Sequence, residues 1–117
     1  MNAIEQESAD GTTLIRLRGE VDLSWSQQVR KAVLDALTSS SRVGVDLAEV
    51  GYIDSSGIAA LVEGFQQART QGRGFALVAV SDAVRSVLEL ARLDRVFPLV
   101  DEVGAIPAVT AAPAWKP

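Results

Sequence analysis

Residues 43–57 run from a predicted strand to the start of a predicted helix. They read Val43-Gly44-Val45-Asp46-Leu47-Ala48-Glu49-Val50-Gly51-Tyr52-Ile53-Asp54-Ser55-Ser56-Gly57. The first five residues are a short apolar run with β-branched side chains, which predicts a buried strand. Apolar residues recur at helical spacing from Ile58 to Phe65, so a helix is expected from near Ser55 to just before Gly72. The residues between these two elements are expected to form a loop.

A hairpin is predicted ahead of this stretch. Asp10-Gly11 is a strong turn signal between a weak strand candidate at residues 3–7 and a stronger one at residues 12–18. Because side chains alternate along a strand, the second strand is expected to turn its apolar side chains to the core and its arginines away from it. These side chains are Ile15 and Leu17 on the core side, and Arg16 and Arg18 on the other side.

A first helix is predicted over residues 25–38, where apolar side chains follow helical spacing. Ser24 is expected to cap this helix, because Gln27 follows three places later as in a capping box. Trp25, at the start of the helix, is interpreted either as a half-buried core residue or as a contact for a partner.

The second half of the chain predicts one more strand and one more helix. Residues 75–80 are a continuous apolar run, as expected for a strand covered on both faces. Ser81 is expected to cap a third helix. Residues 95–97 are expected to form a short final strand and residues 101–106 a last helical turn. The proline-containing tail, residues 107–117, is expected to be disordered.

This order of elements indicates an α/β fold. A hairpin followed by alternating helices and strands predicts a mixed sheet of four to five strands with helices packed on it. A chain of 117 residues is the size of one domain, which is expected to span residues 1–106.

Composition excludes several classes of function. The chain has no cysteine and no histidine, which excludes thiolate chemistry and a serine–histidine–aspartate triad. Its formal net charge of −4 argues against binding to nucleic acid, where a basic patch supplies most of the affinity. The chain shows no signal peptide and no apolar run near the ~20 residues of a membrane span. A cytoplasmic binding protein without a cofactor is therefore expected, rather than an enzyme.

The candidate site is the run Asp54-Ser55-Ser56-Gly57. The carboxyl ends of strands carry the sites of open α/β sheets, and either Asp54 or Ser55 fits the cap position of the helix. Gly57 is expected to leave the backbone bare for a partner. A phosphate on a serine here is expected to be tolerated, because free N–H groups and the helix dipole favour an anion.

Other kinds of site do not fit the residues of this loop. No lysine follows Gly57, so the loop is not a phosphate-binding P-loop, and it contains no G-x-S-x-G nucleophile elbow. Three carboxylates, Asp46, Glu49 and Asp54, have a spacing that matches no pattern of metal ligands, so no metal is expected.

Three elements in the right order resemble the STAS domain family and, within it, the anti-sigma-factor antagonists. They are Gly19-Glu20-Val21-Asp22-Leu23, Val45-Asp46-Leu47 followed by Tyr52-Ile53-Asp54-Ser55-Ser56-Gly57, and Leu93-Asp94-Arg95-Val96-Phe97. The resemblance covers about residues 1–106. It departs at Ala59, where the family often has glycine.

The resemblance implies a binding module that is switched by phosphorylation. Members bind an anti-sigma factor that is also a serine kinase, and this binding releases the sigma factor. The kinase then phosphorylates the first serine after the aspartate, the complex dissociates, and a serine phosphatase restores the free form. Carried over, the phosphoacceptor is Ser55, with Ser56 as the second candidate. The implied partner surface comprises Asp22, Asp54, Ser55, Ser56, Gly57 and Ile58.

The family likeness admits two other functions. Related domains are subunits of phospholipid ABC transporters, where the serine need not be phosphorylated. Others are components of stress-signalling scaffolds. The oligomeric state is left open.

Overall fold

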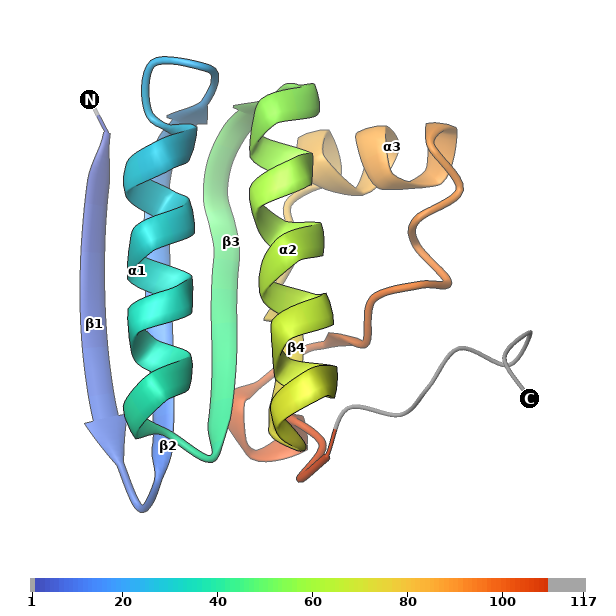
Figure 1. Cartoon of the computed structure of the whole chain (residues 1–117). Helices are drawn as coiled ribbons and strands as arrows, with labels where there is room; N and C mark the ends of the chain where they lie inside the picture. The colour runs from blue at the N-terminus through green and yellow to red at the C-terminus, as the bar shows by residue number, and fades with distance from the viewer. Residues whose placement is uncertain (1, 110–117) are drawn as a thin grey trace.

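Five strands lie side by side in the order β1-β2-β3-β4-β5 in the computed structural model, which describes residues 2–109 (Figure 1). The strands are β1 (Ala3–Ala9), β2 (Thr12–Val21), β3 (Arg42–Ile53), β4 (Gly74–Val78) and β5 (Leu99–Val100). The first two strands pair antiparallel, and every later pair is parallel. The predicted mixed sheet with an opening hairpin is confirmed.

Three helices connect the strands: α1 (Ser26–Ser39), α2 (Ser55–Gln71) and α3 (Asp82–Leu90). The first two lie side by side on one face of the sheet (Figure 1). The third packs against the part of β3 that runs on past the end of β4, and Ser81 makes this junction. Its Oγ donates to the Val50 carbonyl at 2.7 Å and accepts from the Val84 amide at 3.3 Å, which confirms Ser81 as the cap of α3.

The main core lies between the sheet and the helices. Ile15 and Leu17 of β2 are buried in it, as the alternation predicted. The opposite face of the sheet holds a smaller buried cluster of Leu14, Ala76, Val78 and Ile106. Ile106, which follows the 3-10 turn η1 (Val103–Ala105), therefore brings the end of the domain across the back of the sheet.

The back of the hairpin is charged. Each arginine of β2 pairs with a glutamate of β1 and with a carboxylate of β3. The pairs are Arg16 with Glu7 and Asp46, and Arg18 with Glu5 and Glu49. The arginines thus lie on the side away from the main core, as predicted.

β3 is longer than predicted. It continues past Leu47 to Ile53, through the segment that was expected to be a loop. In this second half the buried positions are Leu47, Val50 and Ile53, three residues apart, because the pairing with β2 shifts register twice. A strand is identified in a sequence by buried and exposed residues that alternate one by one, and these register shifts remove that alternation. Only Asp54 separates β3 from α2.

The predicted capping box of the first helix is wrong. Trp25 occupies the N-cap position and makes no side-chain capping bond. The Ser24 hydroxyl donates instead to Asp22 Oδ1 at 2.6 Å, so it is engaged within the preceding turn. Trp25 is only 6 % exposed, which supports the interpretation as a core residue over that as a partner contact.

The end of the domain differs from the prediction in detail. The expected strand at residues 95–97 is a turn, in which the Val96 and Phe97 amides donate to the Leu93 carbonyl. Phe97 is buried against the rings of Phe65 and Phe75, so the apolar signal came from a core anchor. The final strand is β5, and β4 ends two residues before its predicted end. Residues 110–117 of the predicted tail lie outside the described residues.

Candidate functional site

The site forms where two neighbouring parallel strands end together. Val21 of β2 lies opposite Ile53 of β3, and the Asp54 amide donates to the Val21 carbonyl at 3.2 Å. Asp22 and Asp54, which directly follow these strands, therefore lie at the same edge of the sheet. The structure thus brings Asp22 close to the run that begins at Asp54.

Asp54 is the N-cap of α2, which decides between the two residues that fitted this position. Its Oδ1 accepts from the Ser56 amide at 2.9 Å, the Gly57 amide at 3.2 Å and the Ser56 hydroxyl at 2.6 Å. The hydroxyl bond is the main reason that the pKa of Asp54 is lowered; burial opposes it. Backbone N–H groups, including that of Leu23, also lower it.

The two adjacent serines differ in exposure and bonding. Ser55 is the first residue of α2 and is exposed, and its hydroxyl has no hydrogen-bond partner among residues 2–109. Ser56 is half-buried, and its hydroxyl is held by Asp54. Of the two, Ser55 is the hydroxyl that is free to react with an incoming group.

The amides at the start of α2 are mostly occupied. A helix begins with four N–H groups that have no partner within the helix. Here the Asp54 amide donates to Val21, and the Ser56 and Gly57 amides donate to the Asp54 carboxylate. The expectation that free N–H groups would receive a phosphate is therefore wrong for three of the four.

Gly57 is buried, so the expectation that its bare backbone faces a partner is wrong. A Cβ at this position would lie 2.7 Å from the Val21 carbonyl oxygen and 2.7 Å from Ile53 Cγ1. The missing side chain lets α2 begin directly against the ends of β2 and β3. Ile58, the next residue, is half-buried and packs against the main core.

Asp22 forms a similar turn at the end of β2. Its Oδ1 accepts from the Ser24 amide at 3.0 Å and from the Ser24 hydroxyl at 2.6 Å. This turn presents Leu23 with 74 % of its surface exposed, near the Asp54 carboxylate. Sequence reasoning missed Leu23, although an apolar residue inside a polar turn is the signal that identifies it.

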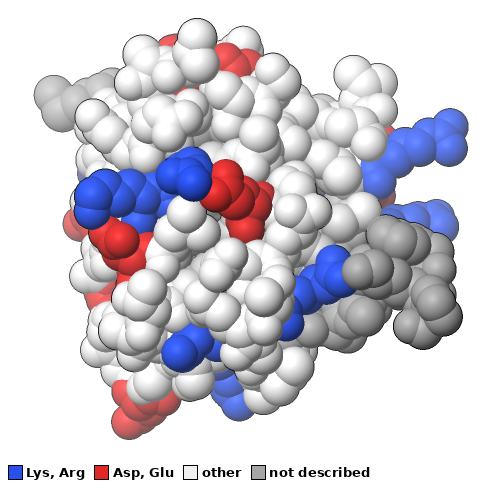
Figure 2. Space-filling view, in the orientation of Figure 1, with Lys and Arg blue, Asp and Glu red and all other residues white. Residues whose placement is uncertain are grey.

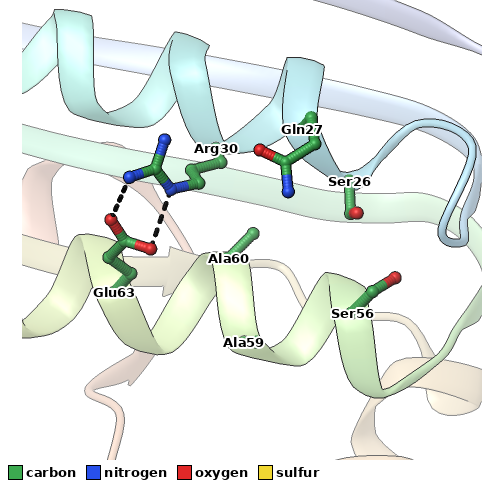
Figure 3. A pocket seen from close by; sticks show the side chains of 7 residues that line it. All are labelled: Ser26, Gln27, Arg30, Ser56, Ala59, Ala60 and Glu63. Atoms are coloured by element: carbon green, nitrogen blue, oxygen red, sulfur yellow. Dashed lines mark hydrogen bonds and ion pairs between the residues drawn. The ribbon is translucent and has the colours of Figure 1, made fainter.

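A groove of about 170 Å³ runs between α1 and α2 next to the site. Figure 3 shows Ser26 opposite Ser56 at one end and Arg30 opposite Glu63 at the other. Arg30 Nε and Nη2 contact the two carboxylate oxygens of Glu63 at 2.8 and 2.6 Å. This bidentate pair raises the pKa of Arg30 and lowers the pKa of Glu63. Sequence reasoning missed it, because the partners are 33 residues apart.

Charges of both signs are mixed on the face that α1 and α2 cover (Figure 2). Within residues 2–109, no group of three or more carboxylates is placed to hold a metal ion. The described part of the chain also has no helix that is both long and apolar enough to cross a membrane.

Comparisons with known proteins agree with this geometry. Residues 4–101 match the family model described as "Mlab, STAS domain". The chain is 27% identical over 106 residues to an anti-sigma F factor antagonist of Paenibacillus polymyxa, covering 88% of this chain and 91% of the relative. An anti-sigma factor antagonist structure from Mycobacterium paratuberculosis is 25% identical, with a TM-score of 0.78 and 89% of each chain covered.

SpoIIAA, an anti-sigma factor antagonist, shares the fold at lower identity. Its unphosphorylated form has a TM-score of 0.73 at 22% identity and covers 86% of this chain and 88% of its own. Its phosphorylated form, from Bacillus, has a TM-score of 0.69 at 21% identity and covers 86% and 91%. The family match spans most of the domain, and the five-stranded sheet with its three helices agrees with it. The chain therefore belongs to the STAS domain family.

Proposed function

We propose that this chain is an anti-sigma-factor antagonist whose binding is switched off by phosphorylation of Ser55. The observation that carries the proposal is the exposed hydroxyl of Ser55, which has no partner among the described residues and stands on the first residue of α2. The likeness to a named antagonist along 88% of the chain supports the same function. The chain acts by binding rather than by catalysis, in the cytoplasm.

The switch works by charge rather than by a change of fold. A phosphate adds about −1.5 to −2 charges at neutral pH. On Ser55 it would stand beside the Asp54 carboxylate, which already carries a negative charge. A partner that covers this edge would then have to desolvate both groups, at a cost of several kcal/mol. Each ~1.4 kcal/mol weakens binding tenfold, so one phosphate is enough to separate the complex.

The partners follow from this cycle. The unphosphorylated chain binds an anti-sigma factor that is also a serine kinase. That kinase ends the complex by modifying Ser55, and a serine phosphatase restores the binding form. Asp22, Asp54 and Ser56 shape the edge that the partner covers.

The test uses two variants of the same residue as bait in lysate of the native cells. Ser55→Ala should retain the anti-sigma factor, because it removes the phosphoacceptor and adds no charge. Ser55→Asp should lose it by tenfold or more, because the carboxylate puts a charge where the phosphate would stand. The captured protein is then purified and incubated with ATP and the wild-type chain, which it should phosphorylate at Ser55. Equal capture by the two variants would contradict the switch.

A second candidate function is a subunit of a phospholipid ABC transporter, which membership of the STAS domain family also admits. In this role the same edge would hold a transporter ATPase, and Ser55 would remain unmodified. The two functions predict different captured proteins. A transport ATPase retained by wild type and Ser55→Ala, with no phosphate on the wild-type chain from several growth conditions, would support this second function.

A further inference from the structure

The environment of the two adjacent serines suggests how one of them is selected. The Asp54 carboxylate accepts from the Ser56 hydroxyl at 2.6 Å, a length typical of a charge-assisted hydrogen bond from a hydroxyl to a carboxylate. A group transferred to that oxygen would break the bond and place new charge against the carboxylate. Ser55 has no such bond among the described residues.

The position of Ser56 adds a second restriction. Ser56 is half-buried and lines the α1–α2 groove opposite the buried Ser26 (Figure 3). A phosphate on Ser56 would have to enter or displace this narrow space. Ser55 is exposed, and nothing in the groove depends on it.

Asp54 also determines where a phosphate on Ser55 can go. The carboxylate takes up the Ser56 and Gly57 amides, which are donors that a phosphate at a helix start would otherwise use. A phosphate on Ser55 is thus kept from folding back onto α2. It stays at the surface, where a partner and a phosphatase can meet it.

We propose that Asp54 is the positioning residue that selects the modified serine: it withholds Ser56 and directs both the modification and the resulting phosphate to the outside of α2 at Ser55. This inference rests on the proposed function for its biological use. Its physical part concerns only which serine can carry a phosphate in the folded chain.

The first test needs no kinase. Phosphoserine is installed genetically at position 55 or at position 56 of the full chain, and thermal unfolding is followed by circular dichroism. Phosphate at 55 should lower the midpoint by less than about 3 °C, as an ordinary surface change does. Phosphate at 56 should lower it by about 5 °C or more, because it breaks the bond to Asp54 and sets two anions together.

The same measurement in Asp54 variants assigns the difference to this residue. Asp54→Asn keeps an oxygen that can accept a hydrogen bond but removes the charge, so phosphate at 56 should lower the unfolding midpoint by less in this variant than in wild type. Asp54→Ala removes both and should reduce the penalty further. Equal tolerance of the two phosphoserines, or a penalty at 56 that does not change in either Asp54 variant, would overturn the proposal.

Mapping of phosphate in the native cells separates this proposal from the function on which it rests. Peptide mass spectrometry should find Ser55 alone modified in wild type and in Asp54→Asn, and both serines modified in Asp54→Ala. Modification of Ser56 in wild type would contradict the role of Asp54. A wild-type chain without phosphate would contradict the proposed function alone, because the unfolding comparison tests Asp54 independently.

Discussion

Two turns with the same local pattern end the neighbouring strands β2 and β3. Asp22 is followed by Leu23 and Ser24, and Asp54 is followed by Ser55 and Ser56. In both turns the aspartate Oδ1 accepts from the amide and the hydroxyl of the serine two places later, and the hydroxyl bond is 2.6 Å long in each. In both, the middle residue is exposed.

The two turns differ at the third residue after the aspartate. After Asp54 this residue is Gly57, whose amide donates to the carboxylate as α2 begins. After Asp22 it is Trp25, whose amide donates to the Asp22 carbonyl while its ring fills the core, and α1 begins only at Ser26. An Asp-x-Ser turn therefore does not by itself cap a helix. The third residue decides whether the helix can start against the strand ends.

The largest loss of stability is expected at Trp25, the third residue after the aspartate in the turn that ends β2. Trp25→Ala should reduce the free energy of unfolding by about 3–5 kcal/mol, because it leaves a large cavity in the main core. Leu23→Ala, two residues earlier and exposed, should change it by less than about 0.5 kcal/mol. Urea unfolding of both variants measures the difference. Similar losses of unfolding free energy in the two variants would contradict the assignment of Trp25 to the core and Leu23 to the surface.

The equivalent position of the second turn should follow. Gly57→Ala should cost about 1–3 kcal/mol, because the added methyl group meets the Val21 carbonyl, which cannot move out of the way as a side chain could. Gly51→Ala is the matched control, since a Cβ there has no neighbour within 4 Å. Urea unfolding again compares the two. A stable Gly57→Ala chain would show that α2 can start farther from the strands.

A smaller difference in stability is expected between variants of the two aspartates, Asp54 and Asp22. Asp54→Ala should lower the melting temperature more than Asp22→Ala, because Asp54 caps a helix with three bonds, whereas Asp22 holds a turn with two. Both losses should be smaller than that of Gly57→Ala. Equal losses would show that the cap adds nothing beyond the turn.

The smallest effect is a dependence on pH. The pKa of Asp54 in the folded chain lies below its ordinary value of 3.8, so the ionised carboxylate stabilises the fold above that value. This stabilisation is lost as the pH falls through the lowered folded pKa. The stability difference between wild type and Asp54→Asn should therefore be constant near neutral pH and change only below about pH 4. A change centred near pH 6 would assign the effect to another group.

Much of the fold was predictable because its signals are local. Asp10-Gly11 marked the hairpin, and the apolar spacing after Ser55 marked α2 with its end near Gly72. The second half of β3 was missed because its register shifts give buried residues every third position, a spacing that no regular strand has. The capping box at Ser24 failed because α1 begins one residue later than predicted, at Ser26, so that Trp25 rather than Ser24 stands at the N-cap.

The site was predictable as a set of residues but not as a set of bonds. Asp54, Ser55 and Ser56 are adjacent, so their proximity required no structure. Which of the two serine hydroxyls donates to Asp54 depends on the backbone conformation at Asp54, between β3 and α2. The buried position of Gly57 depends on β2, which is more than thirty residues away, and no local pattern reports such contacts.

The antiparallel first strand has a practical consequence for anyone who attaches this domain to something else. Asn2 Oδ1 accepts from the Glu20 amide at 2.9 Å, so the chain enters the domain at the edge that carries Ser55. Pro107 lies against Gly74, at the opposite end of the parallel strands. A fluorophore, affinity tag or surface linker joined ahead of Asn2 would crowd any partner of Ser55, whereas one attached to the surface near Pro107 would lie at the far end of the strands.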